Sequence, residues 1–247
     1  MVEHLVYTER VGGSSPSPPT NALTRFAAPL AFAAVLAALA FAAPAFGQDG
    51  QMRFRMARLE GPLCHRRCPE VIVADGVIED GTPQAFVDFV KTATVDPGLR
   101  AVVFMNSPGG QVVASMKLGA IFRKLKVVGI VGRVAAHGSL EGPIAGSCVS
   151  ACVYALMGAI RRIVPPQSQV ATHRMSAEEK TLAQWVFGGH GARRLADQDM
   201  VDALARYAAG MGVSAALVRE AESRSPEDVH VLSARELRRW RLETSQS

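Results

Sequence analysis

The sequence predicts an α/β fold with a largely parallel sheet, because short apolar runs alternate with segments of helical spacing along most of the chain. Apolar runs at residues 71–74, 101–105 and 127–131 have the length and the flanking turns of buried strands. Segments with apolar residues at helical spacing lie between these runs, at 82–90 and 112–125. Strands that alternate with helices in this order are typical of parallel sheets.

Local signals support the individual elements. Thr82 is a suitable N-cap, and Pro83 is favoured at the first position of a helix. Residues 132–147 lack periodicity over a length that indicates a functional loop. The remaining elements that we expect are a small-residue helix at 150–158, strands at 162–164 and 170–173, helices at 177–187, 192–211 and 215–221, a strand at 229–232 and a helix from Ser233.

The composition is that of a globular protein with a full core. The chain has 247 residues, of which 49% are apolar and 20% are charged. Much of the net charge of +5 comes from arginines beyond residue 190, which alternate with acidic and apolar residues at helical spacing and so indicate a solvated helix face. No basic stripe is interleaved with aromatic residues, and we therefore expect no nucleic-acid partner.

The N-terminal segment has the pattern of a signal peptide. Arg25 precedes an uncharged, alanine-rich run at 27–43, and the small residues Ala45 and Gly47 follow at the positions that signal peptidase recognises. We expect cleavage after Gly47 and a periplasmic or secreted protein. An N-terminal membrane anchor is the alternative, because the run approaches the roughly 20 residues that a spanning helix needs. Its alanine content makes it only weakly hydrophobic, which favours cleavage.

We therefore divide the chain into three segments. Residues 1–47 form a signal peptide whose long leading segment, rich in Gly, Ser and Pro, is expected to be disordered, unless the true start lies downstream of Met1. Residues 48–69 form a linker that carries a cysteine pair. Residues 70–247 form a single domain.

The four cysteines form two close pairs, each with three residues between its members: Cys64 with Cys68, and Cys148 with Cys152. An oxidising compartment favours disulfides, and four cysteines allow three pairings. Zinc is the alternative, with His65 and His137 as further ligands. Common zinc sites have two residues between paired cysteines, so we expect disulfides, no metal and no other cofactor.

Three segments carry residues suited to chemistry. Residues 106–110, Asn-Ser-Pro-Gly-Gly, follow a buried strand and expose a backbone that a ligand can approach closely. Ser150 lies among small residues at the start of a helix, where backbone amides and the positive helix end favour a developing oxyanion. His173 ends a predicted strand, at the edge where α/β sheets bind ligands. Each alone is more often structural, as a turn, an N-cap or a core histidine; their order along the chain favours a site.

This order resembles the proteolytic subunit of Clp protease, over a match that runs from about Val71 to Leu242. The resemblance implies a Clp/crotonase-like core of repeated β-β-α units, with Ser150 as nucleophile and His173 as base. The Cys-Val-Ser-Ala-Cys segment around Ser150 and the Cys-Pro-Glu segment at Cys68 look, more closely, like poorly characterised exported bacterial proteins with a Clp-like domain.

The resemblance also implies an oxyanion site and a triad acid. Gly109 and Gly110 match the family's glycine turn, in which the second glycine donates to the oxyanion, and the amide of Ala151 is the second donor. In the family an aspartate shortly precedes a Leu-Ser-Ala segment, which is present here at 232–234. A strict count places Val229 at the position of the acid, and Asp228 is the adjacent candidate.

Other arrangements remain open: a Ser–His dyad, an acid from elsewhere, or a Ser–Lys dyad as in the related signal peptide peptidases, although no lysine follows Ser150 before Lys180.

The function that we expect is an exported serine hydrolase, specifically a peptidase that acts on peptides or unfolded chains. No ATPase partner is expected, because the periplasm lacks ATP and the mature N-terminal stretch has no counterpart of the segments that bind an unfoldase. The resemblance implies a homo-oligomer, with contacts between Ala177 and Met211. The alternative is a catalytically inactive Clp/crotonase-fold module for binding or assembly.

Overall fold

The computed structural model describes residues 50–59, 70–93, 101–137, 140–179 and 192–244. The predicted signal peptide and the first cysteine pair lie outside these ranges. Among the described residues, no helix is long and apolar enough to cross a membrane.

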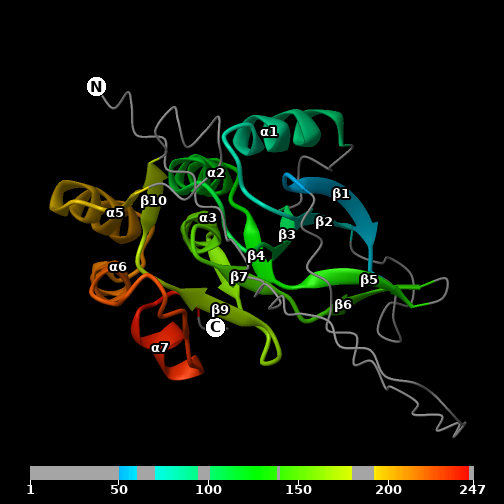
Figure 1. Cartoon of the computed structure of the whole chain (residues 1–247). Helices are drawn as coiled ribbons and strands as arrows, with labels where there is room; N and C mark the ends of the chain where they lie inside the picture. The colour runs from blue at the N-terminus through cyan, green and yellow to red at the C-terminus, as the bar shows by residue number, and fades with distance from the viewer. Residues whose placement is uncertain (1–49, 60–69, 94–100, 138–139, 180–191, 245–247) are drawn as a thin grey trace, which may run out of the picture. The chain divides into compact units, whose positions relative to one another are not determined.

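The main sheet has five strands in the order β1-β2-β3-β4-β8 (Figure 1). Strands β2, β3, β4 and β8 pair in parallel, and β1 adds an antiparallel edge. The predicted α/β class with a largely parallel sheet is confirmed. The bounds are Arg53–Arg58 for β1, Glu70–Asp75 for β2, Val102–Asn106 for β3, Val128–Val131 for β4 and Arg161–Ile163 for β8.

Strand β1 was not expected, because residues 48–69 read as a linker. Its sequence alternates arginine with apolar residues, and only Ala57 in it is fully buried. Such a strand gains its apolar contacts only when it pairs with β2, so the local sequence gives a weak signal.

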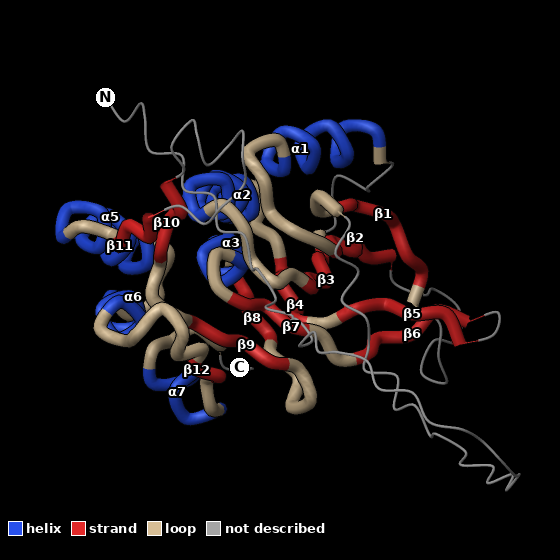
Figure 2. The backbone as a smooth tube through the Cα atoms, viewed as in Figure 1, coloured by secondary structure: helices blue, strands red, loops and turns tan. Residues whose placement is uncertain are grey.

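The two faces of the main sheet pack against different partners. Side chains alternate along β2, so Ile72 belongs to the large core under the helices, whereas Val71 and Val73 pack with Phe104 and Val134 in a smaller cluster. The large core includes buried residues of α1 at Thr82–Thr92, α2 at Val112–Lys124 and α3 at Cys152–Gly158, and of the C-terminal helices described below. Figure 2 shows the helices and strands along the backbone.

A second, three-stranded sheet carries the candidate site. Its strands are β7 at Ser147–Val149, β9 at Gln169–Thr172 and β12 at His230–Val231. β7 and β9 pair in parallel, and β12 pairs antiparallel with β9. Because parallel strands end at the same edge of a sheet, the residues after β7 and β9 lie on one edge.

Residues 132–147, expected to be a loop, contain a hairpin instead. Strand β5 spans Arg133–His137 and pairs antiparallel with β6 at Leu140–Ile144. Val134 is buried while Arg133 is exposed, which is the alternation of a strand with one buried face. Only one large apolar residue marks that face in β5, so the period of two was not visible in the sequence.

The prediction of a helix at 177–187 is wrong for residues 177–179, which belong to a strand. Strand β10 at Ser176–Glu179 pairs antiparallel with β11 at Ala192–Leu195, and residues 180–191 lie outside the described ranges. Pairing between segments distant in sequence overrides a helical pattern here. The helix expected from residue 192 begins later, as α5 at Gln198–Gly210, and the Asp197 side chain caps it by accepting a hydrogen bond from the Met200 N–H at 2.9 Å.

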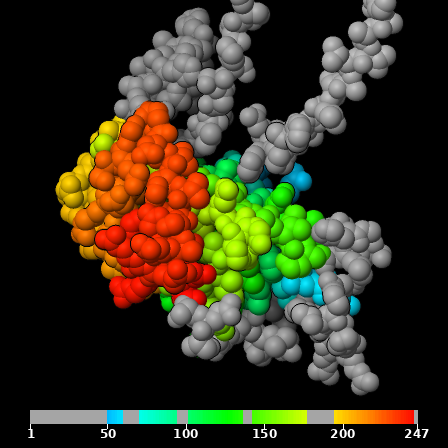
Figure 3. Space-filling model, turned by 90° about the horizontal axis from the view of Figure 1, so that it is seen from below, coloured from blue at the N-terminus to red at the C-terminus, as the bar shows by residue number. Residues whose placement is uncertain are grey.

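The C-terminal helices complete the domain. After α5 follow α6 at Ala215–Glu222 and α7 at Ala234–Arg239, and Figure 3 shows them in orange and red on one side of the molecule. The Tyr207 hydroxyl of α5 donates to the Tyr154 carbonyl of α3 at 2.9 Å. Burial raises the pKa of Tyr207, so this hydroxyl stays a donor throughout the physiological range.

Candidate active site

Ser150 occupies a sharp turn between strand β7 and helix α3. Its φ of 57° is left-handed, a conformation that residues with a side chain rarely adopt. The Ser150 N–H donates to the Ala171 carbonyl at 2.9 Å, and the Ser150 carbonyl accepts from the Val153 N–H at 3.1 Å. A strained serine between a strand and a helix is the geometry that presents the nucleophile in α/β-hydrolases.

The predicted glycine turn lies against this serine. Gly109 and Gly110 have φ values of 114° and 135°, which only glycine adopts readily. A Cβ at position 109 would lie 2.9 Å from the Ser150 Cβ and 3.2 Å from the Ala151 nitrogen. A Cβ at position 110 would overlap the Ile78 carbonyl oxygen. Both positions therefore require glycine for two reasons: neighbouring atoms leave no room for a Cβ, and the positive φ is unfavourable for other residues.

Hydrogen bonds hold the turn and leave two amides available. The Ile78 N–H donates to the Gly109 carbonyl at 2.8 Å, and the Gly109 N–H donates to the Ser107 hydroxyl at 3.1 Å. Within the described part of the chain, the N–H groups of Gly110 and Ala151 donate to no acceptor. These are the two donors that the sequence assigned to the oxyanion.

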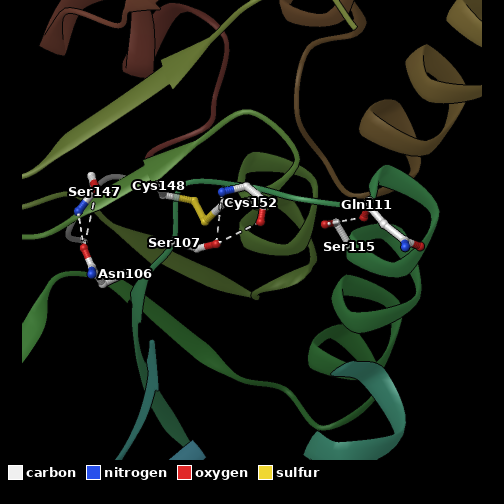
Figure 4. The surroundings of a disulfide bond; sticks show 8 residues. Asn106, Ser107, Gln111, Ser115, Ser147, Cys148 and Cys152 are labelled. Atoms are coloured by element: carbon white, nitrogen blue, oxygen red, sulfur yellow. Dashed lines mark hydrogen bonds between the residues drawn. A yellow bond between two sulfur atoms is a disulfide. The ribbon is translucent and has the colours of Figure 1, made fainter. Parts of the chain in front are cut away.

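Asn106 ties the serine strand to the main sheet. Its amide nitrogen donates to the Asp75 carboxylate at 3.0 Å, and its amide oxygen accepts from the Ser147 N–H at 2.9 Å (Figure 4). Two backbone bonds add to this link, from the Ser107 N–H to the Ser147 carbonyl at 2.8 Å and from the Val149 N–H to the Ser107 carbonyl at 3.0 Å. The segment before the glycines thus fixes β7 beside β3.

His173 follows strand β9 directly and is half-buried. It lines the same pocket as Ser150, so the two residues lie on one face of the molecule. The other lining side chains come mainly from α3 and α6 and are mostly apolar: Val153, Tyr154, Met157, Thr172, Met175, Leu217, Val218 and Ala221.

Asp228, the candidate acid, is placed differently from this pair. It is exposed, and its carboxylate accepts from the Arg224 guanidinium at 3.0 Å. Arg224 also forms an ion pair with this carboxylate at the surface. Its role as the triad acid stays a prediction.

A second carboxylate was missed by sequence reasoning. Glu222, at the end of α6, is 7% exposed, and its carboxylate accepts from the Met175 N–H at 3.2 Å. Met175 lines the pocket two residues after His173. In the sequence, Glu222 belongs to a polar, arginine-rich helix, where an acid is more often solvated than buried.

A disulfide bond brackets the serine. Cys148 and Cys152 are bonded with a Cα–Cα distance of 5.3 Å, which confirms this pair as a disulfide (Figure 4). Their sulfur atoms are bonded to each other and are not available as zinc ligands. Cys64 and Cys68 lie outside the described residues. Among the residues described, no group of His, Cys, Asp and Glu side chains is arranged to hold a metal ion.

No protein-family model matches the chain, and no curated protein matches it. Among solved structures it is similar to the 1510-N membrane-bound stomatin-specific protease. One mutant of that protease matches with a TM-score of 0.49 and 17% sequence identity, over 69% of this chain and 75% of that chain. A second mutant, solved in complex with a substrate peptide, matches with a TM-score of 0.49 and 18% identity, over 69% of this chain and 71% of that chain. At these values the likeness assigns no function to this chain.

Proposed function

We propose that this chain is an exported serine hydrolase of the Clp/crotonase superfamily, an ATP-independent peptidase with Ser150 as nucleophile and His173 as general base. The observation that carries the proposal is the left-handed Ser150, which shares a pocket with His173 and lies against the glycine turn. A purely structural serine has no need of this conformation, because an N-cap residue adopts ordinary extended dihedral angles.

The chemistry follows from these positions. The Ser150 hydroxyl attacks the peptide carbonyl while His173 takes its proton, and the N–H groups of Gly110 and Ala151 bind the oxyanion. When the tetrahedral intermediate collapses, the leaving amine takes the proton from His173. Water then attacks the acyl-enzyme with His173 again as base, which releases the peptide fragment with its new carboxyl end and restores the serine.

The surroundings of Ser150 and His173 are apolar. The α3 wall of their pocket presents Val153 and Met157, and its α6 wall presents Leu217 and Val218. Among the described residues that line it, none is Asp, Glu, Lys or Arg. Each of these four residues is only 1% exposed. They therefore form the apolar support beneath Ser150 and His173, and the substrate chain would lie above them.

Fluorophosphonate labelling of the purified protein tests the proposal. The wild-type protein should be labelled at Ser150, as read by peptide mass spectrometry, because these probes need an activated serine. Ser150→Ala and His173→Ala should lose nearly all labelling, and the double variant should lose little more, since the two residues act as one unit. Ser223→Ala, which removes an exposed hydroxyl on the surface, is the matched control. Labelling that persists in Ser150→Ala would favour the inactive binding or assembly module.

A further inference from the structure

The bond between Cys148 and Cys152 closes a small covalent ring, and Ser150 is the middle residue of that ring. Cys148 lies in strand β7, which leads into the serine turn, and Cys152 is the first residue of helix α3, which leaves it. The bond therefore joins the two elements whose junction sets the direction of the Ser150 side chain.

The ring is built into the core beside the oxyanion turn. Both cysteines are 0% exposed. Cys148 pairs with Val170 of β9 on one side and forms a bridge with Ser107 of the glycine-turn segment on the other. Figure 4 shows the two sulfur atoms next to the Ser107 side chain. A disulfide at this position constrains the site itself, whereas a staple for the whole domain has no need to lie there.

The site has two features that need such a constraint. Ser150 is held at a φ of 57°, and a chain free to relax would favour a negative φ, which turns the hydroxyl away from its present direction. The Ala151 N–H, the proposed oxyanion donor, lies inside the same ring, next to Cys152. Relaxation of the ring would therefore displace the nucleophile and one oxyanion donor together.

We propose that the Cys148–Cys152 disulfide is a positioning element for the serine, so that the oxidised chain is the active form. This inference rests on the function proposed above. Misplacement of reacting groups by about 1 Å lowers rates by about 100-fold. Loss of the bond should therefore lower the rate of the chemical step in a protein that is still folded. A disulfide that only stabilises the domain would leave that rate unchanged.

The test compares the rate of fluorophosphonate labelling at Ser150 with and without the bond. A Cys64→Ala/Cys68→Ala background leaves one disulfide to study. In one arm, a phosphine reductant and water convert the disulfide to two thiols and the phosphine to its oxide. In the other arm, Cys148→Ala/Cys152→Ala removes the bond genetically. Far-UV circular dichroism and thermal unfolding identify the conditions in which each sample is folded.

We expect the maximal labelling rate to fall at least tenfold in both arms, while the probe concentration for half-maximal rate changes less than twofold. The phosphine should have no effect on the double variant. Equal rates in folded oxidised and folded reduced protein would overturn the inference. Unfolding of both bond-free forms at 25 °C would also overturn it, because the bond would then stabilise the whole domain. If oxidised wild-type protein is not labelled at all, the proposed function fails first.

Discussion

A methyl group at position 109 tests whether the glycine turn and the serine form one site. Gly109→Ala would place a Cβ 2.9 Å from both the Ser150 Cβ and the Val149 carbonyl oxygen, at a residue with a φ of 114°. These neighbours are a backbone atom and the first side-chain carbon, which cannot rotate out of the way. Either the glycine turn or the serine turn must therefore move.

The expected magnitude has two parts. A residue with a side chain at such a φ costs about 1–3 kcal/mol, and overpacking of a close contact costs about 1–3 kcal/mol. The free energy of unfolding should fall by roughly 2–6 kcal/mol, the sum of these two ranges. Labelling of Ser150 should fall by about 100-fold or more, because the oxyanion donors and the nucleophile separate.

Urea unfolding and the rate of fluorophosphonate labelling measure the two effects. Gly210→Ala is the matched control, because a Cβ at Gly210, the last residue of α5, meets nothing within 4 Å. It should keep the wild-type labelling rate and gain up to about 1 kcal/mol, since alanine restricts the unfolded chain. A Gly109→Ala protein with a wild-type labelling rate and a stability within about 0.5 kcal/mol of wild type would refute the close contact between the turns.

Three further predictions concern the acid, pH and export. Glu222→Gln should lower peptide turnover more than Asp228→Asn, because Glu222 is buried beside the pocket whereas Asp228 pairs with Arg224 at the surface; the reverse order would support Asp228 as the acid. Hydrogen bonds from the Ser233 hydroxyl and N–H, and from His230, lower the pKa of Glu236 to about 2. As pH falls, the unfolded chain takes up a proton at Glu236 near pH 4.5, whereas the folded chain keeps this carboxylate ionised down to about pH 2. Its capping contribution of about 1 kcal/mol is therefore present above pH 4.5 and should be lost as pH falls from about 4.5 to 2. Glu236→Gln should abolish that part of the pH dependence of thermal unfolding. The intact mass of periplasmic protein should correspond to a chain that begins at Gln48; a full-length chain in the membrane fraction would favour the anchor.

The parts of the fold that were predicted correctly carry their signal locally. Strands β2 and β3 are apolar runs with buried residues on both faces, and β4 is an apolar run with one buried and one half-buried face. Such runs are visible without knowledge of their partners. Strands β1, β5 and β10 were missed because their stability comes from antiparallel partners that the local sequence does not specify.

Some residues of the candidate site could likewise be predicted from local sequence, and others could not. Ser150, the glycine turn and His173 each follow a strand, so their order along the chain predicts that they meet at one edge. Glu222 could not be predicted as a candidate, because it is buried by the packing of α6 against the pocket segment and has no motif of its own. The left-handed φ of Ser150 was likewise invisible in sequence, although small residues around it are consistent with a crowded turn.

The register of β12 on β9 leads to a last prediction, a gain of function. His230 pairs with Thr172, so one further step of the antiparallel register places Val229 opposite His173. This is also the position at which a strict count along the sequence places the acid of the Clp family. Residues directly opposite in antiparallel strands project to the same face with Cβ atoms about 4.5–5.5 Å apart.

Val229→Asp should therefore place a carboxylate beside the imidazole and raise peptide turnover about tenfold or more, since such an acid orients the histidine and stabilises its charged form. The change should cost little stability, because Val229 is 53% exposed. Val231→Asp is the matched control, with a residue 49% exposed and opposite Ala171. If Val229→Asp turns over peptide no faster than Val231→Asp, either β12 does not continue its register to His173 or another carboxylate already serves the histidine. Glu222→Gln in the Val229→Asp background separates these two outcomes, because only an acid already in use makes the double variant slower than Val229→Asp alone.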